Sequence, residues 1–161
     1  NPPLTVSYLG FVLGQDENNL ESQPVADCAA TTNSMAGNYS IILSGGSDTN
    51  YALALANGTL TVLALSPVIT APSYMNVQSL TADLGGEVTA LNGDQVTERG
   101  VSWSINPDFL FGEGTRVSET GTFGLGSFTV PVSGLSAGSS NYFMAFAVNS
   151  GGTNHTRQRL S

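Results

Sequence analysis

Residues 37–64 read GNYSIILSGGSDTNYALALANGTLTVLA, and this stretch decides the predicted fold. Apolar residues alternate with polar or small ones in three runs, a pattern typical of strands with one buried face, because successive strand side chains point to opposite sides. The runs are Tyr39, Ile41 and Leu43; Tyr51, Leu53 and Leu55; and Leu60, Val62 and Ala64. Asn57-Gly58 favours a two-residue type I′ turn that would set Leu55 opposite Leu60 and place both apolar rows on one side. We therefore predict a hairpin here within an all-β protein.

The composition indicates a folded β-protein with an acidic surface. The chain has 161 residues, which allows one large sandwich or two small domains, and its apolar content of 40% suits a folded core. The four basic residues are all arginines and the formal net charge is −8. This charge balance argues against nucleic-acid binding, because such binding depends on Lys and Arg side chains that neutralise phosphates. No apolar run has the length of a membrane helix, so we expect no membrane insertion.

Before the opening stretch, residues 4–13 are expected to form strand, and residues 23–32 are expected to be irregular or extended. An acidic loop between them holds Asp16 and Glu17, with Glu21 nearby. These carboxylates could ligate a cation, but they lack the alternating spacing and the glycine of a calcium loop, so we interpret them as a solvated turn. The lone Cys28 is interpreted as a small buried hydrophobe, because no histidine or basic residue lies close in sequence to activate it.

Two stretches carry a family pattern: NPPLTVSYLGFVLGQDENNL at residues 1–20 and AGNYSIILSGGSDTNYALALANGTLTV at residues 36–62. They resemble the MBG-type repeats of large bacterial secreted and surface proteins, and the resemblance covers residues 1–64. Members of that family usually carry one more strand, ending near a Tyr-Gly pair, just before the NPxLT element. That strand is absent here. The resemblance implies either that the segment was cut inside the domain or that a neighbouring segment supplies the strand.

Pro67 and Pro72 punctuate the chain, because proline interrupts a hydrogen-bonded ladder. We place a domain boundary there, which gives modules at residues 1–65 and 66–161 that lie end to end with limited freedom. Beyond residue 68, turn signals recur about every ten residues, and short strands at that spacing predict a sandwich.

The stretches GGEVTALNGDQVTERGVSWS (residues 85–104) and GSFTVPVSGLSAGSSNYFMAFAVNSGGT (residues 126–153) resemble bacterial fibronectin-type-III-like modules. The resemblance implies an immunoglobulin/fibronectin III-like sandwich. It also places the family's buried strand aromatic at Trp103, which we interpret as core and not as a ring platform for a sugar. The family's corner tyrosine, whose hydroxyl anchors on upstream backbone, falls on Asn141.

The strand that contains Tyr142 is apolar on both faces. The register that the family implies gives an inward row, Phe143, Ala145 and Ala147, and an outward row, Tyr142, Met144, Phe146 and Val148. Two interpretations stay open. Either neighbouring strands and long side chains cover the outward row, or Tyr142, Met144 and Phe146 form an exposed contact patch for another module or a partner.

The sequence predicts no catalytic, cofactor-binding or metal site. His155 is the single histidine, no G-x-S-x-G turn is present, and a lone histidine makes a poor metal site. We interpret His155 as an exposed residue of an edge strand. The twelve acidic residues are scattered singly and mostly favour solubility.

Together these features favour non-enzymatic spacer or adhesive modules of a long multidomain bacterial cell-surface or secreted protein. The expected partners are neighbouring modules of the same chain, and the expected location is extracellular. Two alternatives remain: a glycan-recognition module attached to a secreted enzyme, and a fibre subunit that self-associates by strand exchange through an open sheet edge.

Overall fold

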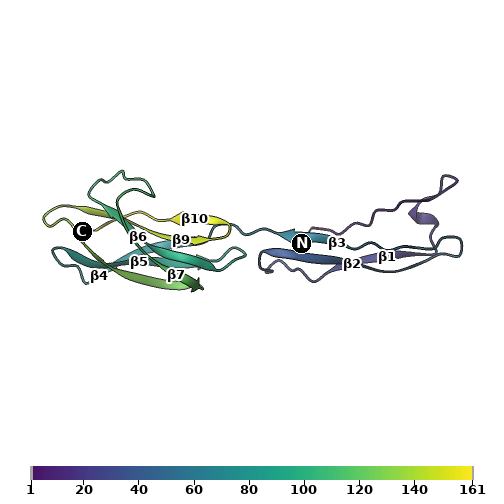
Figure 1. Cartoon of the computed structure of the whole chain (residues 1–161), viewed down its shortest axis with the longest axis horizontal. Coiled ribbons are helices and arrows are strands. Elements are labelled where there is room, and N and C mark those ends of the chain that lie inside the picture. The colour runs from purple at the N-terminus through teal and green to yellow at the C-terminus, as the bar shows by residue number, and fades with distance from the viewer. Residues whose placement is uncertain (1, 161) are drawn as a thin grey trace. The chain divides into compact units, whose positions relative to one another are not determined.

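The computed structural model describes residues 2–160, with the backbone alone at Arg159, and the chain divides into two compact units (Figure 1). The units are Asn1–Val62 and Leu63–Ser161. Apart from the single-turn 3₁₀ helix η1, Glu17–Asn19, the regular elements of the described residues are strands, which confirms the all-β prediction. Within residues 2–160 no helix reaches the length and apolarity needed to cross a membrane.

The first unit contains one antiparallel sheet in the order β1-β2-β3. Its strands are β1 Ser22–Cys28, β2 Gly37–Ser47 and β3 Gly58–Val62. Half-buried and exposed residues alternate along β2 and β3, as the one-faced pattern predicts. The sequence did not identify β1 as a strand. It holds Pro24, which an edge strand tolerates because one side of its backbone needs no ladder partner.

The predicted Asn57-Gly58 hairpin is wrong. Gly58 begins β3 opposite Ile41 of β2, and neither Asn57 nor Gly58 has a positive φ. The Asn57 side-chain oxygen instead accepts a hydrogen bond from the Leu43 N–H at 3.0 Å, just beyond the last β2–β3 pair. Pairing with the long β2 sets Leu60 opposite Tyr39 on the half-buried face, and this cross-strand packing outweighs the local turn preference.

Two further strand predictions are wrong in the same unit. Residues 51–57 and residues 2–11 run as extended chain outside the described ladders. The pattern correctly indicated the half-buried side chains of Leu4, Val6, Tyr8, Tyr51 and Leu53, but Leu55, expected on the same face, is 42% exposed. The pattern could not predict which strand each segment would pair with, because alternation indicates a buried face and carries no information about the neighbouring strand.

The second unit is a sandwich of two antiparallel sheets, as the spacing of turn signals predicts (Figure 1). One sheet has the order β4-β5-β8 and comprises β4 Val68–Met75, β5 Thr81–Ala90 and β8 Gly126–Ser133. The other has the order β10-β9-β6-β7, with β11 also paired to β9, and comprises β6 Val96–Ser104, β7 Thr115–Phe123, β9 Asn141–Asn149, β10 Gly152–His155 and β11 Gln158–Leu160.

The inner faces of these two sheets supply the core of the second unit. Trp103 is buried in it, which confirms its interpretation as core. Phe143, Ala145 and Ala147 of β9 also lie in this core, so the predicted inward row is correct. The remaining core side chains include Ile69, Leu84, Val88, Val101, Phe128, Val130 and Leu135.

Candidate functional site

The predicted contact patch lies on the opposite face of β9, away from the core. Met144 is 1% exposed and Phe146 is 0% exposed, whereas Tyr142 is half-buried. The exposure expected of Met144 and Phe146 is therefore corrected: both side chains are covered within the chain itself. At Met144 and Phe146 the first of the two interpretations therefore holds: other side chains of the chain cover the outward row.

Aromatic side chains from the loop between β6 and β7, residues 105–114, form this cover. The Phe111 ring packs on the Phe146 ring at a centroid distance of 5.3 Å and an interplanar angle of 66°. The same Phe111 ring stacks on the His155 imidazole at 5.0 Å and 5°. Phe109, from the same loop, is 1% exposed. The loop thus buries apolar area on the outer face of the sheet.

Arg157 holds this loop in place. Its guanidinium donates hydrogen bonds to the carbonyl oxygen of Pro107 at 3.0 Å and to the carbonyl oxygen of Phe109. The guanidinium carbon also lies 5.7 Å from the centroid of the Phe109 ring. Arg157 lies between β10 and β11, the two strands that pair with β9.

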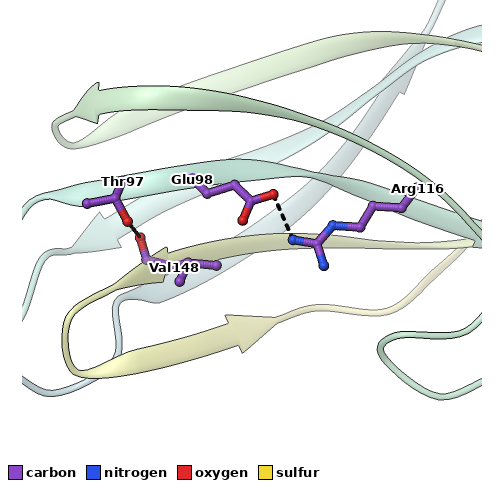
Figure 2. A network of polar contacts seen from close by, with 4 residues as sticks. All are labelled: Thr97, Glu98, Arg116 and Val148. Atoms are coloured by element: carbon purple, nitrogen blue, oxygen red, sulfur yellow. Dashed lines mark hydrogen bonds and ion pairs between the residues drawn. The ribbon is translucent and has the colours of Figure 1, made fainter.

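Arg116 of β7 completes the cover. Its guanidinium carbon lies 4.1 Å from the centroid of the Phe146 ring, within the range of a cation–π contact. The same side chain pairs with the Glu98 carboxylate of β6 at 2.8 Å, as Figure 2 shows. Beside this pair, the Thr97 hydroxyl donates to the Val148 carbonyl oxygen at 3.3 Å (Figure 2). Strands β6, β7 and β9 are therefore tied together on this face by side chains as well as by their ladders.

Glu98 makes the stability of the second unit depend on pH. A hydrogen bond from the Ser118 hydroxyl, and after it the Arg116 guanidinium, lowers the pKa of the Glu98 carboxyl. A lowered folded-state pKa contributes stability that is fully present above the ordinary pKa of glutamate and is lost as the pH falls through the folded value.

We therefore expect Glu98→Gln to cost about 0.2–1 kcal/mol at neutral pH, the range of partly exposed ion pairs. The difference in free energy of unfolding between wild type and variant should shrink in acid, below the ordinary glutamate pKa of about 4.3. Urea unfolding at both pH values measures it. Asp108→Asn, at an exposed carboxylate of the same unit, is the matched control. A Glu98→Gln difference that stays constant with pH would contradict the prediction.

Asn141 occupies the corner position, where the resembling family has a tyrosine, and its side chain also bonds to upstream backbone. It is buried, and its side-chain oxygen accepts a hydrogen bond from the Ser136 N–H at 3.1 Å. Its amide nitrogen donates to the carbonyl oxygens of Ser136 and Ser139, each at 3.2 Å. The side chain thus anchors β9 on upstream backbone, with a shorter residue than the tyrosine of the resembling family.

A second polar cluster, which sequence reasoning missed, fixes the segment that enters the second unit. The buried Asn149 amide donates to the carbonyl oxygens of Leu65 and Leu91, each at 2.9 Å, and to that of Asp94 at 3.4 Å. The Asn149 side-chain oxygen accepts from the Gly151 N–H at 2.8 Å. The Asn149 side chain therefore joins three parts of the second unit. These are its entering segment at Leu65, the β5–β6 turn at Leu91 and Asp94, and the turn after β9 at Gly151.

Asn92 and Gly151 contribute to the same cluster. The Leu65 N–H donates to the Asn92 carbonyl oxygen at 2.9 Å, and the Asn92 amide donates to the Ser66 carbonyl oxygen at 2.8 Å. A Cβ on Gly151 would lie 2.4 Å from the Leu65 carbonyl carbon, so this close approach requires glycine. We call Asn92, Asn149 and Gly151 the connector anchor. In the sequence, these residues look like ordinary turn signals.

The acidic residues considered as cation ligands have roles within the first unit. Asp16 is the N-cap of η1 and accepts a hydrogen bond from the Asn18 N–H at 2.9 Å. The Glu21 carboxylate accepts a hydrogen bond from the Thr49 hydroxyl. Across the described residues, no three side chains of His, Cys, Asp or Glu lie close enough together to hold a metal ion. Cys28 is half-buried on β1, not fully buried as expected. His155 is exposed on the edge strand β10, as predicted.

The first unit also carries an apolar groove of about 420 Å³. Residues 6–11 form one wall and residues 51–56 form the other, while Pro24 and Leu43 of the sheet line it between them. The walls meet where the Phe11 and Tyr51 rings contact each other edge to face, at a centroid distance of 5.3 Å and an interplanar angle of 84°.

Residues 1–61 match the family model described as MBG domain (YGX type). No curated protein matches the chain in sequence. Among solved structures, the chain is similar to domains d3–d4 of the rat CD45 extracellular region, with a TM-score of 0.50 and 10% identity over 99% of this chain and 83% of that chain. It is also similar to titin domains A168–A170, with a TM-score of 0.45 and 14% identity over 78% of this chain and 40% of that chain. The chain thus spans less than half the length of the titin structure.

The first unit is accordingly similar to MBG domains, and the second has the fold of immunoglobulin and fibronectin III sandwiches. Modules of both kinds are typically structural and non-catalytic.

Proposed function

We propose that this chain supplies non-enzymatic spacer or adhesive modules within a long multidomain bacterial cell-surface or secreted protein. The connector anchor carries the proposal. Leu65 is bonded through both its N–H and its carbonyl oxygen, so only Leu63 and Ala64 lie between the end of β3 at Val62 and this anchored residue. A short connector fixed at one end limits bending between modules, and a stalk needs that stiffness.

The side chains best suited to chemistry are used for packing in the second unit, which supports a non-enzymatic role. Arg157 holds the loop of residues 105–114, Arg116 covers Phe146, and His155 stacks on Phe111. The partners we propose are neighbouring modules of the same polypeptide, and the location we propose is outside the cell. The match to the MBG family model and the acidic composition without lysine support this location.

The test of the spacer role is the distribution of distances between two spin labels, one in each unit. The labels are attached through Ser40→Cys and Ser127→Cys, both at exposed positions, in a Cys28→Ser background. We expect a narrow distribution for the wild-type connector and a broader one after Asn149→Ala, because that change leaves the Leu65 carbonyl oxygen without its side-chain donor. A broad wild-type distribution would contradict the proposal.

Two further variants make this experiment specific. Asn149→Ala also removes bonds inside the second unit and should cost about 1–3 kcal/mol, so melting curves must show that it still folds. Asn92→Gly is the milder variant, because glycine keeps the positive φ of 53° at this position and removes the amide bonded to Ser66. Gln95→Ala, an exposed neighbour, is the matched control and should leave the distribution unchanged.

Antibodies raised against the chain test the proposed location. We expect them to label intact cells, or the culture medium, of the organism that makes the protein. Labelling that requires permeabilised cells would contradict a surface or secreted role.

A further inference from the structure

The connector anchor contains a chemically reactive dipeptide. Asn-Gly occurs twice in the chain, at Asn57-Gly58 and at Asn92-Gly93. In this dipeptide the glycine backbone nitrogen can attack the asparagine side-chain carbonyl, because glycine has no Cβ to shield the nitrogen or to restrict the backbone. Asparagine is accordingly among the thermolabile residues of proteins. A reaction at Asn92 would change the bonds that hold the segment entering the second unit.

Asn92 and Gly93 are the central residues of the turn between β5 and β6. Their φ angles are 53° and 94°, and the Asp94 N–H donates to the Leu91 carbonyl oxygen at 3.5 Å. Asn92 is exposed, so water reaches its side chain. The Gly93 N–H donates to no protein group within residues 2–160. The nitrogen that would attack is therefore not fixed in a ladder.

The reaction needs water and no other reagent. The Gly93 nitrogen forms a bond to Asn92 Cγ, the Cγ–Nδ2 bond breaks, and ammonia leaves with the proton that the Gly93 nitrogen gives up. The cyclic imide that results takes up water and opens at either of its two carbonyl groups. One opening gives aspartate. The other gives isoaspartate, in which the backbone passes through the former side chain.

Both products weaken the hold on the entering segment. Each lacks the Asn92 amide, which donates to the Ser66 carbonyl oxygen at 2.8 Å. In the aspartate product a carboxylate oxygen replaces the amide, so two acceptors would face each other without a proton between them. In the isoaspartate product the Asn92 main-chain carbonyl, which accepts from the Leu65 N–H at 2.9 Å, becomes a carboxylate beside a lengthened backbone.

The same bonds restrain the reaction while they are intact. The Asn92 amide is held toward Ser66 and the Asn92 main-chain carbonyl is held toward Leu65, so the side chain is not free to turn onto its own backbone. Ring closure therefore takes place from a locally opened state of the anchor. An anchor that has reacted while open lacks the amide that it needs in order to close.

We propose that Asn92-Gly93 is a deamidation site that reacts when the connector anchor opens and whose product keeps the anchor open. The modification thereby turns a reversible opening into a permanent one. The site and its dependence on the anchor stand without the proposed spacer role. The effect on the stiffness of the connector rests on that role.

Mass spectrometry tests the site. The full chain is incubated at physiological pH and temperature, and peptide mapping follows conversion of amide to acid at Asn92 and at Asn57. Enzymatic methylation of isoaspartate identifies the second product. Asn57 lies in the other unit, so its rate serves as an internal reference that is independent of the anchor.

Two variants open the anchor in different ways. Gly151→Ala sets a Cβ 2.4 Å from the Leu65 carbonyl carbon and pushes on the connector without changing the turn that contains Asn92. Asn149→Ala removes the side-chain donor to the Leu65 carbonyl oxygen. We expect each to speed deamidation of Asn92 at least about fivefold, the gain in opening when one such bond is lost. Gly124→Ala, where an added Cβ meets nothing within 4 Å, is the matched control and should leave the rate unchanged.

The rates at the two sites decide the outcome. Equal Asn92 rates in the wild type and both variants would overturn the dependence on the anchor, and an Asn92 that stays intact in Gly151→Ala would overturn the site itself. Fluorescence of Trp103, which lies in the core of the second unit, must match the wild type in at least one of the two variants. Faster reaction only where this fluorescence changes would assign the rate to unfolding and contradict the proposal.

The consequence is measured on the separated product. The deamidated chain carries an added negative charge, so anion exchange separates it from the unreacted chain. Spin labels at positions 40 and 127 should give a broader distance distribution in the deamidated chain and in Asn92→Asp than in the unreacted chain. Equal narrow distributions would show that the product does not release the connector. A broad distribution in the unreacted chain would contradict the spacer role and leave the deamidation rates to decide this proposal.

Discussion

Phe146→Ser is expected to lower the free energy of unfolding of the second unit by at least about 3–5 kcal/mol, the range for truncating a buried phenylalanine. The side chain is fully buried between Phe111 and Arg116, so its loss leaves a cavity and deprives both neighbours of their contact. The serine hydroxyl adds the cost of a polar group in an apolar site. For a domain of this size the melting temperature should fall by at least about 12 °C, which calorimetry or circular dichroism measures.

The control for this prediction lies in the loop that covers Phe146. Leu110 is 65% exposed, and Leu110→Ser should change the melting temperature little because no burial is lost. Phe111→Ala should fall between the two, since Phe111 is half-buried and packs on one side of Phe146. A Phe146→Ser variant that melts with the wild type would show that this face is open in solution and free to act as a contact patch.

Gly85→Ala is expected to be at least as damaging, because there is no room for one methyl group between the central strand β5 and its neighbour β8. A Cβ at Gly85 of β5 would lie 1.8 Å from the Phe128 carbonyl oxygen and 2.8 Å from its carbonyl carbon, both in the backbone of β8. Backbone held in a ladder cannot move aside as the end of a side chain can. We expect a loss of at least about 4 kcal/mol, a size reserved for steric or packing faults in a core. Denaturant unfolding of the purified variant measures it.

Gly124→Ala is the matched control for Gly85→Ala. A Cβ at Gly124 has no heavy atom within 4 Å, and its φ is not positive. The change should therefore stay within about 0.5 kcal/mol of the wild type. A Gly85→Ala protein as stable as Gly124→Ala would mean that β5 and β8 separate without cost at this point.

Much of the second unit could be predicted, because the turn residues and the alternation of apolar residues in its sequence agree with its fold. Turn residues at regular spacing indicated the strands, and alternation on β9 correctly assigned Phe143, Ala145 and Ala147 to the core. The resemblance also placed the corner at Asn141, whose side chain bonds to upstream backbone. Each of these signals depends on residues that are neighbours in the chain.

The features outside the core could not be predicted, because they join residues far apart in sequence. Arg157 reaches back to carbonyl oxygens of Pro107 and Phe109, and the Asn149 amide reaches Leu65. A side-chain bond to a main-chain carbonyl places no demand on the identity of the residue that accepts it. The cover over Phe146 and the connector anchor therefore leave no pattern to find in the sequence.

For residues 37–64, the sequence by itself indicated most of the side chains that face the sheet: the structure keeps Tyr39, Leu43 and Leu60 half-buried, whereas Leu55, expected on the same face, is exposed. Only the tertiary structure decided which segments pair: β3 lies along β2, and residues 51–57 have no ladder within the described chain. The reason is physical. A two-residue period records burial, which each strand carries alone, whereas pairing is a competition among all available edges. In that competition the long edge of β2 outweighs the turn preference of Asn57-Gly58.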